Sequence, residues 1–270
     1  MDVETGLTLQ TDRMIAYVDG AIGWMVFNNP ARRNACSTDM WAAIPGIIDA
    51  FEANPAVRVV VLRGTGETAF VAGADISEFE KTRSSAAANI GYEQLTETAG
   101  KRLAECSKPT IAMIHGFCIG GGVALALGCD LRVTADDGKF GVPAVRLGLG
   151  YGPGGVKKLM DLVGPAFTKE IFFTARHFTA DEAQSMGLVN RVVPKAKLES
   201  YIRNYCGIIA DNAPMTINAL KRTVAELAKL SLQADIEFCN RLVQECFDSQ
   251  DFVEGRRAFL EKRRPVFQGR

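Results

Sequence analysis

The stretch "KPTIAMIHGFCIGGGVALALGCDLRV" (residues 108–133) contains the pattern that decides the fold. The apolar run at 109–116 has the composition of a strand buried on both faces, and 131–135 repeats it. Between them, the three glycines at 120–122 open a run that favours a helix as far as residue 128. Buried strands that alternate with helices predict βα repeats and a largely parallel sheet.

The rest of the chain extends this pattern and then changes. Residues 15–28 alternate around an Asp-Gly turn at 19–20 and predict a hairpin. A buried strand is expected over 57–64, and an α/β core over 1–200 is followed by a helical C-terminal region over 201–270, with a soft boundary near 195–210. The expected helices begin at Ser37 or Thr38 and end near 53, then lie near 91–106, 154–163, 165–173, 179–186, 197–210, 214–230, 233–247 and 251–261.

The composition excludes several classes of protein. Lys plus Arg (31) balance Asp plus Glu (31), so the charge gives no argument for a nucleic-acid partner. No apolar run approaches the ~18–20 residues that span a bilayer, and the acidic, polar start "MDVETGLTLQTDR" does not resemble a leader. The seven cysteines are scattered without a CxxC pair, which favours buried free thiols in a reducing cytoplasm over disulfides or a metal site.

Two loops carry the candidate chemistry. The triple glycine follows the strand at 109–116, and "AGAD" (72–75) follows the strand at 57–64. Ligands in open α/β sheets bind at the carboxyl ends of strands, where free backbone N–H groups suit an anion or a developing oxyanion. The alternative interpretation is that the glycines only permit tight helix packing. Neither loop fits a nucleotide-binding fingerprint.

Five motifs give the chain a resemblance to a known family. "FVAGADISEF", "KPTIAMIHGFCIGGGVALALGCDLRV", "FGVPAVRLGLGYGPGG", "FTADEAQSMGLVNRVV" and "EGRRAFLEKRRPVF" resemble the crotonase superfamily, also called the enoyl-CoA hydratase/isomerase superfamily, in order from about residue 15 to 267. The resemblance implies a spiral of ββα repeats with a helical C-terminal trimerisation region. It also implies a homotrimer or a hexamer, an acyl-CoA thioester as substrate, and no metal or permanently bound cofactor.

The resemblance also implies site residues. By motif position, the N–H groups of Ala74 and Gly121 hold the thioester oxygen. The CoA nucleotide is expected near the turn "PARRNA" (30–35) and the closing helix. The implied CoA-binding residues are Ala31, Arg32, Ala35, Ala72, Ala74, Asp75 and Ile76, with Phe259 and Lys262 near the adenine, often from a neighbouring subunit.

The sequence departs from the hydratases of this family at the two positions that handle water and a proton. The first hydratase glutamate is replaced by Ala124 and the second by Ala144. Alanine neither gives nor takes a proton. Tyr151 stands where the methylmalonyl-CoA decarboxylase branch, which also lacks both glutamates, has a tyrosine. That branch usually carries a histidine where this chain has Ala74. The alternative for Tyr151 is ring packing at a subunit contact.

Three functions therefore stay open. The first is an acyl-CoA lyase that stabilises a thioester enolate. Its most specific version is the decarboxylation of a malonyl-type CoA ester. The second is a hydratase or isomerase with relocated acid/base groups such as Glu78, Glu80 or Tyr151, and the third is a non-catalytic acyl-CoA-binding subunit. The other weighed side chains are His115, His177, Cys118, Asp130 and Arg146, each with a packing, pairing or surface role as its alternative.

Overall fold

The computed structural model of the protein describes residues 3–4, 9–78, 86–212, 214–228, 247–263 and 265. Its larger sheet has seven strands in the order β1-β2-β3-β4-β6-β8-β11. β2 pairs antiparallel with β1 and β3, and the pairs from β3 to β11 are parallel. The strands are β1 (Val3–Glu4), β2 (Met14–Asp19), β3 (Ile22–Phe27), β4 (Val59–Gly64), β6 (Thr110–Ile114), β8 (Leu131–Ala135) and β11 (Arg191–Val193).

A second, four-stranded sheet has the order β10-β9-β7-β5. Its members are β5 (Ala69–Val71), β7 (Phe117–Ile119), β9 (Lys139–Gly141) and β10 (Phe178–Thr179). Each of the pairs β4/β5, β6/β7 and β8/β9 therefore sends its first strand to the larger sheet and its second strand to the smaller one. This repeated division, with a helix after each pair, is the expected spiral of ββα repeats.

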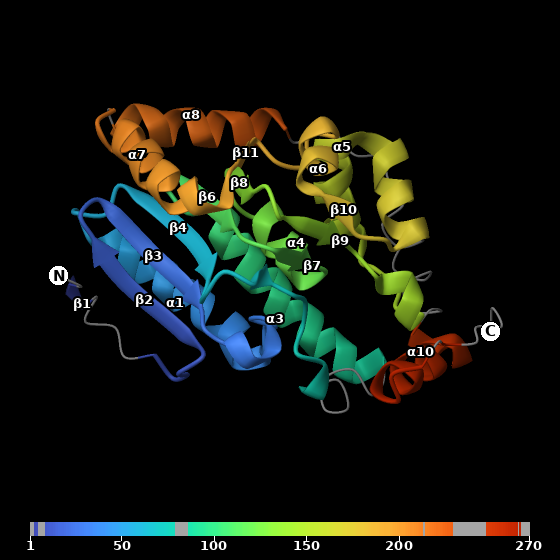
Figure 1. Ribbon diagram of the computed structural model, residues 1–270. Helices are drawn as coiled ribbons and strands as arrows, with labels where there is room; N and C mark the ends of the chain where they lie inside the picture. Colours follow the sequence, from blue (N-terminus) through green and yellow to red (C-terminus); the bar gives the residue numbers. More distant parts are fainter. Residues whose placement is uncertain are drawn as a thin grey trace.

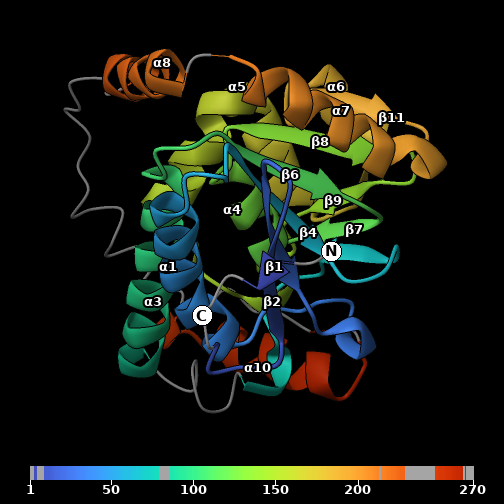
Figure 2. The same ribbon diagram turned by 90° about the vertical axis from the view of Figure 1, so that its left-hand side faces the viewer.

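Helices cover both faces of the larger sheet (Figures 1 and 2). α1 and α3 lie side by side in Figure 2 and pack against each other. α7 lies over the opposite face, where its Leu198, Ile202 and Cys206 join the core formed with Trp24. The helices are α1 (Thr38–Ala53), α3 (Ala86–Ala104), α4 (Gly121–Leu127), α5 (Pro153–Thr174), α6 (Ala180–Ser185), α7 (Leu198–Ala210), α8 (Pro214–Leu227) and α10 (Gln250–Leu260), with the 3-10 turns η1 (Pro30–Arg32), η2 (Ile76–Glu78), η3 (Ala144–Leu147) and η4 (Lys195–Lys197).

Most of the expected elements are confirmed, and the differences have physical reasons. The two helices expected at 154–163 and 165–173 are confirmed as the two parts of α5, which are separated at Gly164, where φ of +73° and ψ of 170° lie outside the helical range. Only helices were expected after residue 153, but this part of the chain also forms β10 and β11. These strands have two and three residues, too few to show an alternating pattern in the sequence. The helix expected at 233–247 lies outside the described residues except for residue 247.

The boundary expected at residue 200 falls inside α7, which packs against the larger sheet. Division of the chain there stays a prediction. Five of the cysteines (36, 106, 118, 129 and 206) are free and buried, while 239 and 246 lie outside the described residues. Among the described helices, none combines the length and the apolar character that crossing a bilayer requires.

Candidate active site

Two loops meet at one end of the smaller sheet. β5 and β7 are parallel neighbours, so their carboxyl ends lie side by side. β5 leads into Ala72–Asp75, and β7 leads through Gly120 into α4. The expectation that these two loops converge is confirmed, but short strands of the smaller sheet position them, rather than the long runs at 57–64 and 109–116.

The backbone around Ala74 is held by a pairing with Cys36. The Cys36 N–H donates to the Gly73 carbonyl at 2.8 Å, and the Asp75 N–H donates to the Cys36 carbonyl at 2.9 Å. In such a parallel bridge the N–H of the central residue points away from the partner strand. The Ala74 N–H is therefore directed away from Cys36, and the backbone bonds of the described residues give it no acceptor.

The Gly121 N–H lies next to it. Gly121 is the first residue of α4, so its N–H has no partner within the helix, and the described backbone bonds give it no other acceptor. A Cβ built on Gly121 would lie 3.6 Å from the Ala74 nitrogen. Since a Cβ is about 2.5 Å from its own nitrogen, the two N–H nitrogens lie within about 6 Å of each other. One oxygen at ~2.9 Å from each nitrogen can bridge that separation.

The three glycines have different reasons to be glycine. Gly120 has φ of +53°, in the left-handed region that side chains disfavour. A Cβ on Gly122 would lie 2.0 Å from the Val71 carbonyl oxygen, so α4 can approach β5 only because that position has no side chain. The packing interpretation therefore accounts for Gly122. At Gly121 a Cβ would meet its neighbours at ordinary contact distances of 3.5–3.6 Å.

The turn at 30–35 is tied to the first of these loops. The Ala72 N–H donates to the Arg33 carbonyl at 3.1 Å, and the Arg32 guanidinium donates to the Asp75 carboxylate at 2.7 Å. The buried Asp75 carboxylate also accepts the backbone N–H and the hydroxyl of Ser77. The expected CoA-binding residues Ala31, Arg32, Ala35, Ala72, Ala74, Asp75 and Ile76 are thus brought together. Phe259 and Lys262 lie elsewhere, at the end of α10, with Phe259 exposed.

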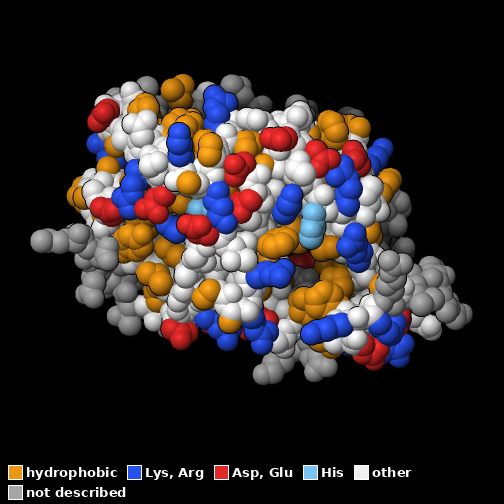
Figure 3. Space-filling model, viewed as in Figure 1, with side chains coloured by type: hydrophobic (Ala, Val, Ile, Leu, Met, Phe, Trp, Pro, Cys, Tyr) orange, Lys and Arg blue, Asp and Glu red, His pale blue; other side chains and the backbone are white. Residues whose placement is uncertain are grey.

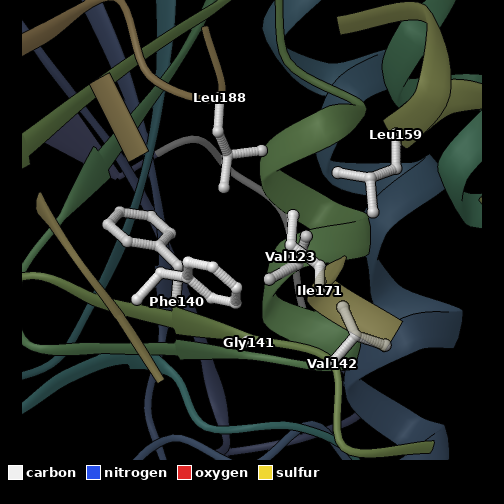
Figure 4. Close-up of a pocket in the computed structure, with 8 residues that line it drawn as sticks. Val123, Phe140, Gly141, Val142, Leu159, Ile171 and Leu188 are labelled. Atoms are coloured by element: carbon white, nitrogen blue, oxygen red, sulfur yellow. The ribbon is translucent and has the colours of Figure 1, made fainter. Parts of the chain in front are cut away.

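The two alanine positions lie in apolar surroundings. Ala144 is buried at the start of η3, and Ala124 is half-buried in the first turn of α4. Their neighbours Val123 and Val142 face an apolar pocket, shown in Figure 4. The other lining residues are Phe140, Gly141, Leu159, Ile171, Phe178 and Leu188. This pocket is a gap in the core that Ala124 and Ala144 do not line, and none of its side chains could transfer a proton.

Tyr151 lies in the loop that precedes α5. Its ring packs edge-on against Phe172, with 5.0 Å between the ring centroids. A Cβ on Gly155 would come within 2.6 Å of the Tyr151 ring, so this glycine makes room for it. The packing role weighed for Tyr151 is thus present within the chain itself, and it fixes the ring while leaving the role of the hydroxyl a proposal.

The structure gives structural roles to several other candidates. Glu78 accepts the Thr38 N–H at 2.8 Å, beside the N-terminus of α1. Asp130 accepts the Thr110 N–H at 2.7 Å and so ties down the turn after α4, as expected. Burial raises the pKa of the Cys118 thiol far above its ordinary value, which disfavours the reactive thiolate. Glu80 lies outside the described residues.

The two histidines and Arg146 belong to other segments of the chain: His115 follows β6, Arg146 lies in η3, and His177 precedes β10. His115 is buried, and burial, followed by the charge of Arg63, lowers its imidazole pKa. His177 is exposed, and its imidazole pKa is lowered by partial burial and then by the charge of Arg146. Among the described residues, no cluster of three His, Cys, Asp or Glu side chains could hold a metal ion.

One face of the molecule is hollowed, and hydrophobic side chains surround the hollow (Figure 3). Lys and Arg side chains lie around it, and acidic atoms are visible at its floor. Residues 18–270 of the chain match the model of the family described as Enoyl-CoA hydratase/isomerase. The chain belongs to the enoyl-CoA hydratase/isomerase family. As a member of this family, it is an acyl-CoA-processing protein, and a CoA thioester is the substrate that fits the family.

Named relatives and solved structures cover nearly the whole chain. The short-chain-enoyl-CoA hydratase of Clostridium acetobutylicum is 33% identical over 95% of this chain and 97% of its own. A structure of an enoyl-CoA hydratase/isomerase family protein from Hyphomonas neptunium is 40% identical, covers 97% of this chain and 100% of its own, and has a TM-score of 0.79. A structure of methylmalonyl-CoA decarboxylase with 2S-carboxypropyl CoA is 27% identical, with the same two coverages and a TM-score of 0.88.

Sequence reasoning missed one residue at this site. The Cζ2 atom of the Trp41 ring lies 3.5 Å from the point that a Cβ on Gly121 would occupy. Trp41 belongs to the buried face of α1, where an aromatic residue reads as ordinary core. Nothing in the local pattern distinguishes it, because its closeness to Gly121 arises from tertiary packing.

Proposed function

We propose that the protein is a lyase that decarboxylates a malonyl-type CoA ester by stabilising a thioester enolate. The observation that carries this proposal is the adjacency of the Ala74 and Gly121 N–H groups, together with alanine at both glutamate positions. An enolate needs donors at its oxygen, and decarboxylation generates the enolate without a base. The two features together favour this reaction within the family.

The proposed reaction converts a malonyl-type CoA ester into carbon dioxide and a shortened acyl-CoA. The bond between C2 and the carboxylate carbon breaks, its electron pair forms the C1–C2 double bond of the enolate, and carbon dioxide leaves. The negative charge moves to the thioester oxygen, where the N–H groups of Ala74 and Gly121 donate to it. A proton from the Tyr151 hydroxyl, resupplied by water, then adds to C2 and gives the shortened acyl-CoA.

Two backbone donors at the enolate oxygen can stabilise the transition state by several kcal/mol. Loss of one preorganised oxyanion donor costs about 2.7–4 kcal/mol in enzymes that use such sites. Donors fixed in the folded backbone need little rearrangement when the charge develops, since the Cys36 pairing already sets the direction of Ala74. Binding alone gains little from such an arrangement, which disfavours the non-catalytic alternative.

The second candidate is an enoyl-CoA hydratase or isomerase with relocated groups. The relatives named as hydratases, such as the 33%-identical enzyme of Clostridium acetobutylicum, favour it. Against it stand the alanines at 124 and 144 and the engagement of Glu78 with the Thr38 N–H. The likeness to methylmalonyl-CoA decarboxylase structures, with a TM-score of 0.88, supports the lyase instead.

In this proposal the CoA moiety lies along the turn at 30–35. The exposed Arg32 side chain, held by Asp75, is suited to the phosphates of CoA, and Ala31, Ala35, Ala72 and Ile76 line its path. Phe259 and Lys262 contact the adenine end, in this subunit or a neighbouring one. No permanently bound cofactor takes part in the reaction.

We also propose that the protein acts in the cytoplasm as a homotrimer or a hexamer of two trimers. The buried free thiols support a reducing compartment. Large apolar side chains that are exposed in the single chain support burial in an assembly: Phe167 and Phe173 on α5, and Leu220 and Val224 on α8.

The test is mass spectrometry of a CoA-thioester panel after incubation with the pure protein. The panel contains malonyl-, methylmalonyl-, ethylmalonyl-, crotonyl- and 3-enoyl-CoA, each with a protein-free control. Loss of carbon dioxide from a malonyl-type ester is the expected result. Gain of water by crotonyl-CoA would instead establish the hydratase, and binding without turnover of any ester would establish the non-catalytic subunit.

A further inference from the structure

The indole N–H of Trp41 is a buried donor without a partner. Trp41 lies on α1 with 3% of its surface exposed, and its Nε1 atom has no hydrogen-bond partner among the described residues. A buried N–H that is left unpaired costs free energy, so an acceptor that joins the protein later would stabilise it. A substrate is such an acceptor if the N–H faces the site.

The indole ring of Trp41 lies beside the paired backbone donors. Cζ2 of Trp41 lies 3.5 Å from the Cβ point of Gly121, and the Ala74 nitrogen lies 3.6 Å from the same point. Cζ2 and Nε1 are bonded to the same ring carbon and are about 2.5 Å apart, so Nε1 lies within about 6 Å of that point. Three donors without a described partner, two backbone and one side-chain, therefore gather around Gly121.

The number of donors suggests which oxygen atom of the substrate accepts a hydrogen bond from each of them. A carbonyl oxygen has two lone pairs, which the Ala74 and Gly121 N–H groups fill. A third donor is thus available to a different oxygen of the same substrate. Within the function proposed above, on which this step rests, that oxygen belongs to the carboxylate attached to C2.

We propose that the Trp41 indole N–H binds the carboxylate of a malonyl-type acyl group and selects for it. A single neutral donor orients the carboxylate without the strong ground-state attraction of a guanidinium. Decarboxylation requires the breaking bond to stand out of the thioester plane, and a hydrogen bond from Trp41 to one carboxylate oxygen would restrict the rotation that moves it away. An acyl group without this oxygen leaves the N–H unpaired, which disfavours crotonyl and similar apolar groups.

The chain offers a matched control for this donor. Trp24 is fully buried, and its Nε1 also has no partner among the described residues. Trp24 belongs to the core between the larger sheet and α7, on the face opposite to α1. Trp41→Phe and Trp24→Phe both remove an indole N–H and keep an aromatic ring, but only the first removes it beside Gly121.

The first readout is turnover. Trp41→Phe is expected to lower kcat/KM for the malonyl-type ester by roughly 10- to 100-fold, the range for one hydrogen bond to a charged group. Trp24→Phe is expected to stay within about 3-fold of the wild type. If the wild type releases carbon dioxide and Trp41→Phe matches Trp24→Phe, the assignment to Trp41 is overturned while the proposed function stands.

The second readout does not depend on turnover. The sequence contains two tryptophans, so a ¹H–¹⁵N spectrum has two indole signals, which the two variants assign. The nitronate form of 2-nitropropionyl-CoA is expected to shift the Trp41 signal, and propionyl-CoA, which lacks the second acceptor, is not. If no malonyl-type ester is decarboxylated, the proposed function fails, and the indole shift alone tests the role of Trp41. Equal shifts of the Trp41 signal with the nitronate and with propionyl-CoA would overturn that role.

Discussion

Replacement of Gly121 by proline removes one N–H of the proposed oxyanion pair and leaves the Ala74 N–H in place. Proline is tolerated at the first position of a helix, which is where Gly121 lies in α4. The matched control is Gly121→Ala, which keeps the N–H. Its Cβ would meet Gly73 and Trp41 at 3.5 Å, an ordinary contact distance, so alanine fits the space.

The expected loss follows from the geometry of the pair. The two nitrogens lie within about 6 Å, so one oxygen can accept from both donors, and the proline removes one of these two hydrogen bonds. We expect kcat of Gly121→Pro to fall by about 10²–10³-fold, equivalent to about 2.7–4 kcal/mol. Gly121→Ala is expected to stay within about 3-fold of the wild type, because its backbone donor is unchanged.

The assay is the initial rate of carbon dioxide release from the ester that the wild type accepts, with Tm measured for each variant. Tm matters because proline also restricts Gly120, whose φ of +53° already requires glycine. If Gly121→Pro is folded and turns over as fast as Gly121→Ala, the Gly121 N–H does not stabilise the transition state, and the proposed oxyanion site is wrong.

Three further predictions concern other parts of the chain. Tyr151→Phe is expected to lower kcat at least 10-fold with little change in CoA affinity measured by calorimetry; equal kinetics would leave only the ring packing on Phe172. Gly122→Ala places a Cβ 2.0 Å from the Val71 carbonyl oxygen and is expected to cost roughly 1–3 kcal/mol, seen as a fall of several degrees in Tm. The lowered pKa of His115 means that the unfolded chain takes up a proton below about pH 6.5 while the folded one does not. The free energy of unfolding, measured with denaturant, should therefore fall as the pH drops from 6.5 toward the lower folded-state pKa, and less so in His115→Gln.

Long local patterns made much of the fold predictable. The buried runs that form β4, β6 and β8 and the Asp-Gly turn between β2 and β3 are strong signals within a few residues. The strands β5, β7 and β9 have three residues each, too few to show a period, and they exist because their neighbours in the smaller sheet supply hydrogen bonds. Local sequence carries no record of such pairing.

At the candidate site, too, local sequence predicted some features, while others depend on tertiary contacts. The "AGAD" and triple-glycine loops were identified from motif resemblance and from their places after strands, and the structure brings them together. The position of Trp41 beside Gly121 was not predictable, since a tryptophan on the apolar face of α1 looks like any other core residue. Likewise, the clash that fixes Gly122 depends on Val71, about fifty positions earlier in the chain.

The pairing of Cys36 with Ala74 has a consequence for the order of folding. It joins residues far apart in the chain, while β5 and β7, which support the loops, are short. The strand pairs of the larger sheet have similar or greater sequence separations but pair over several residues, whereas this contact is a single bridge, so it offsets its loop-closure cost less and is expected to form late. An intermediate with the larger sheet already paired but with the 30–36 segment undocked would therefore have native-like secondary structure and no aimed Ala74 donor. Recovery of turnover during refolding should then lag behind the far-ultraviolet signal, which makes activity a reporter of the final docking step.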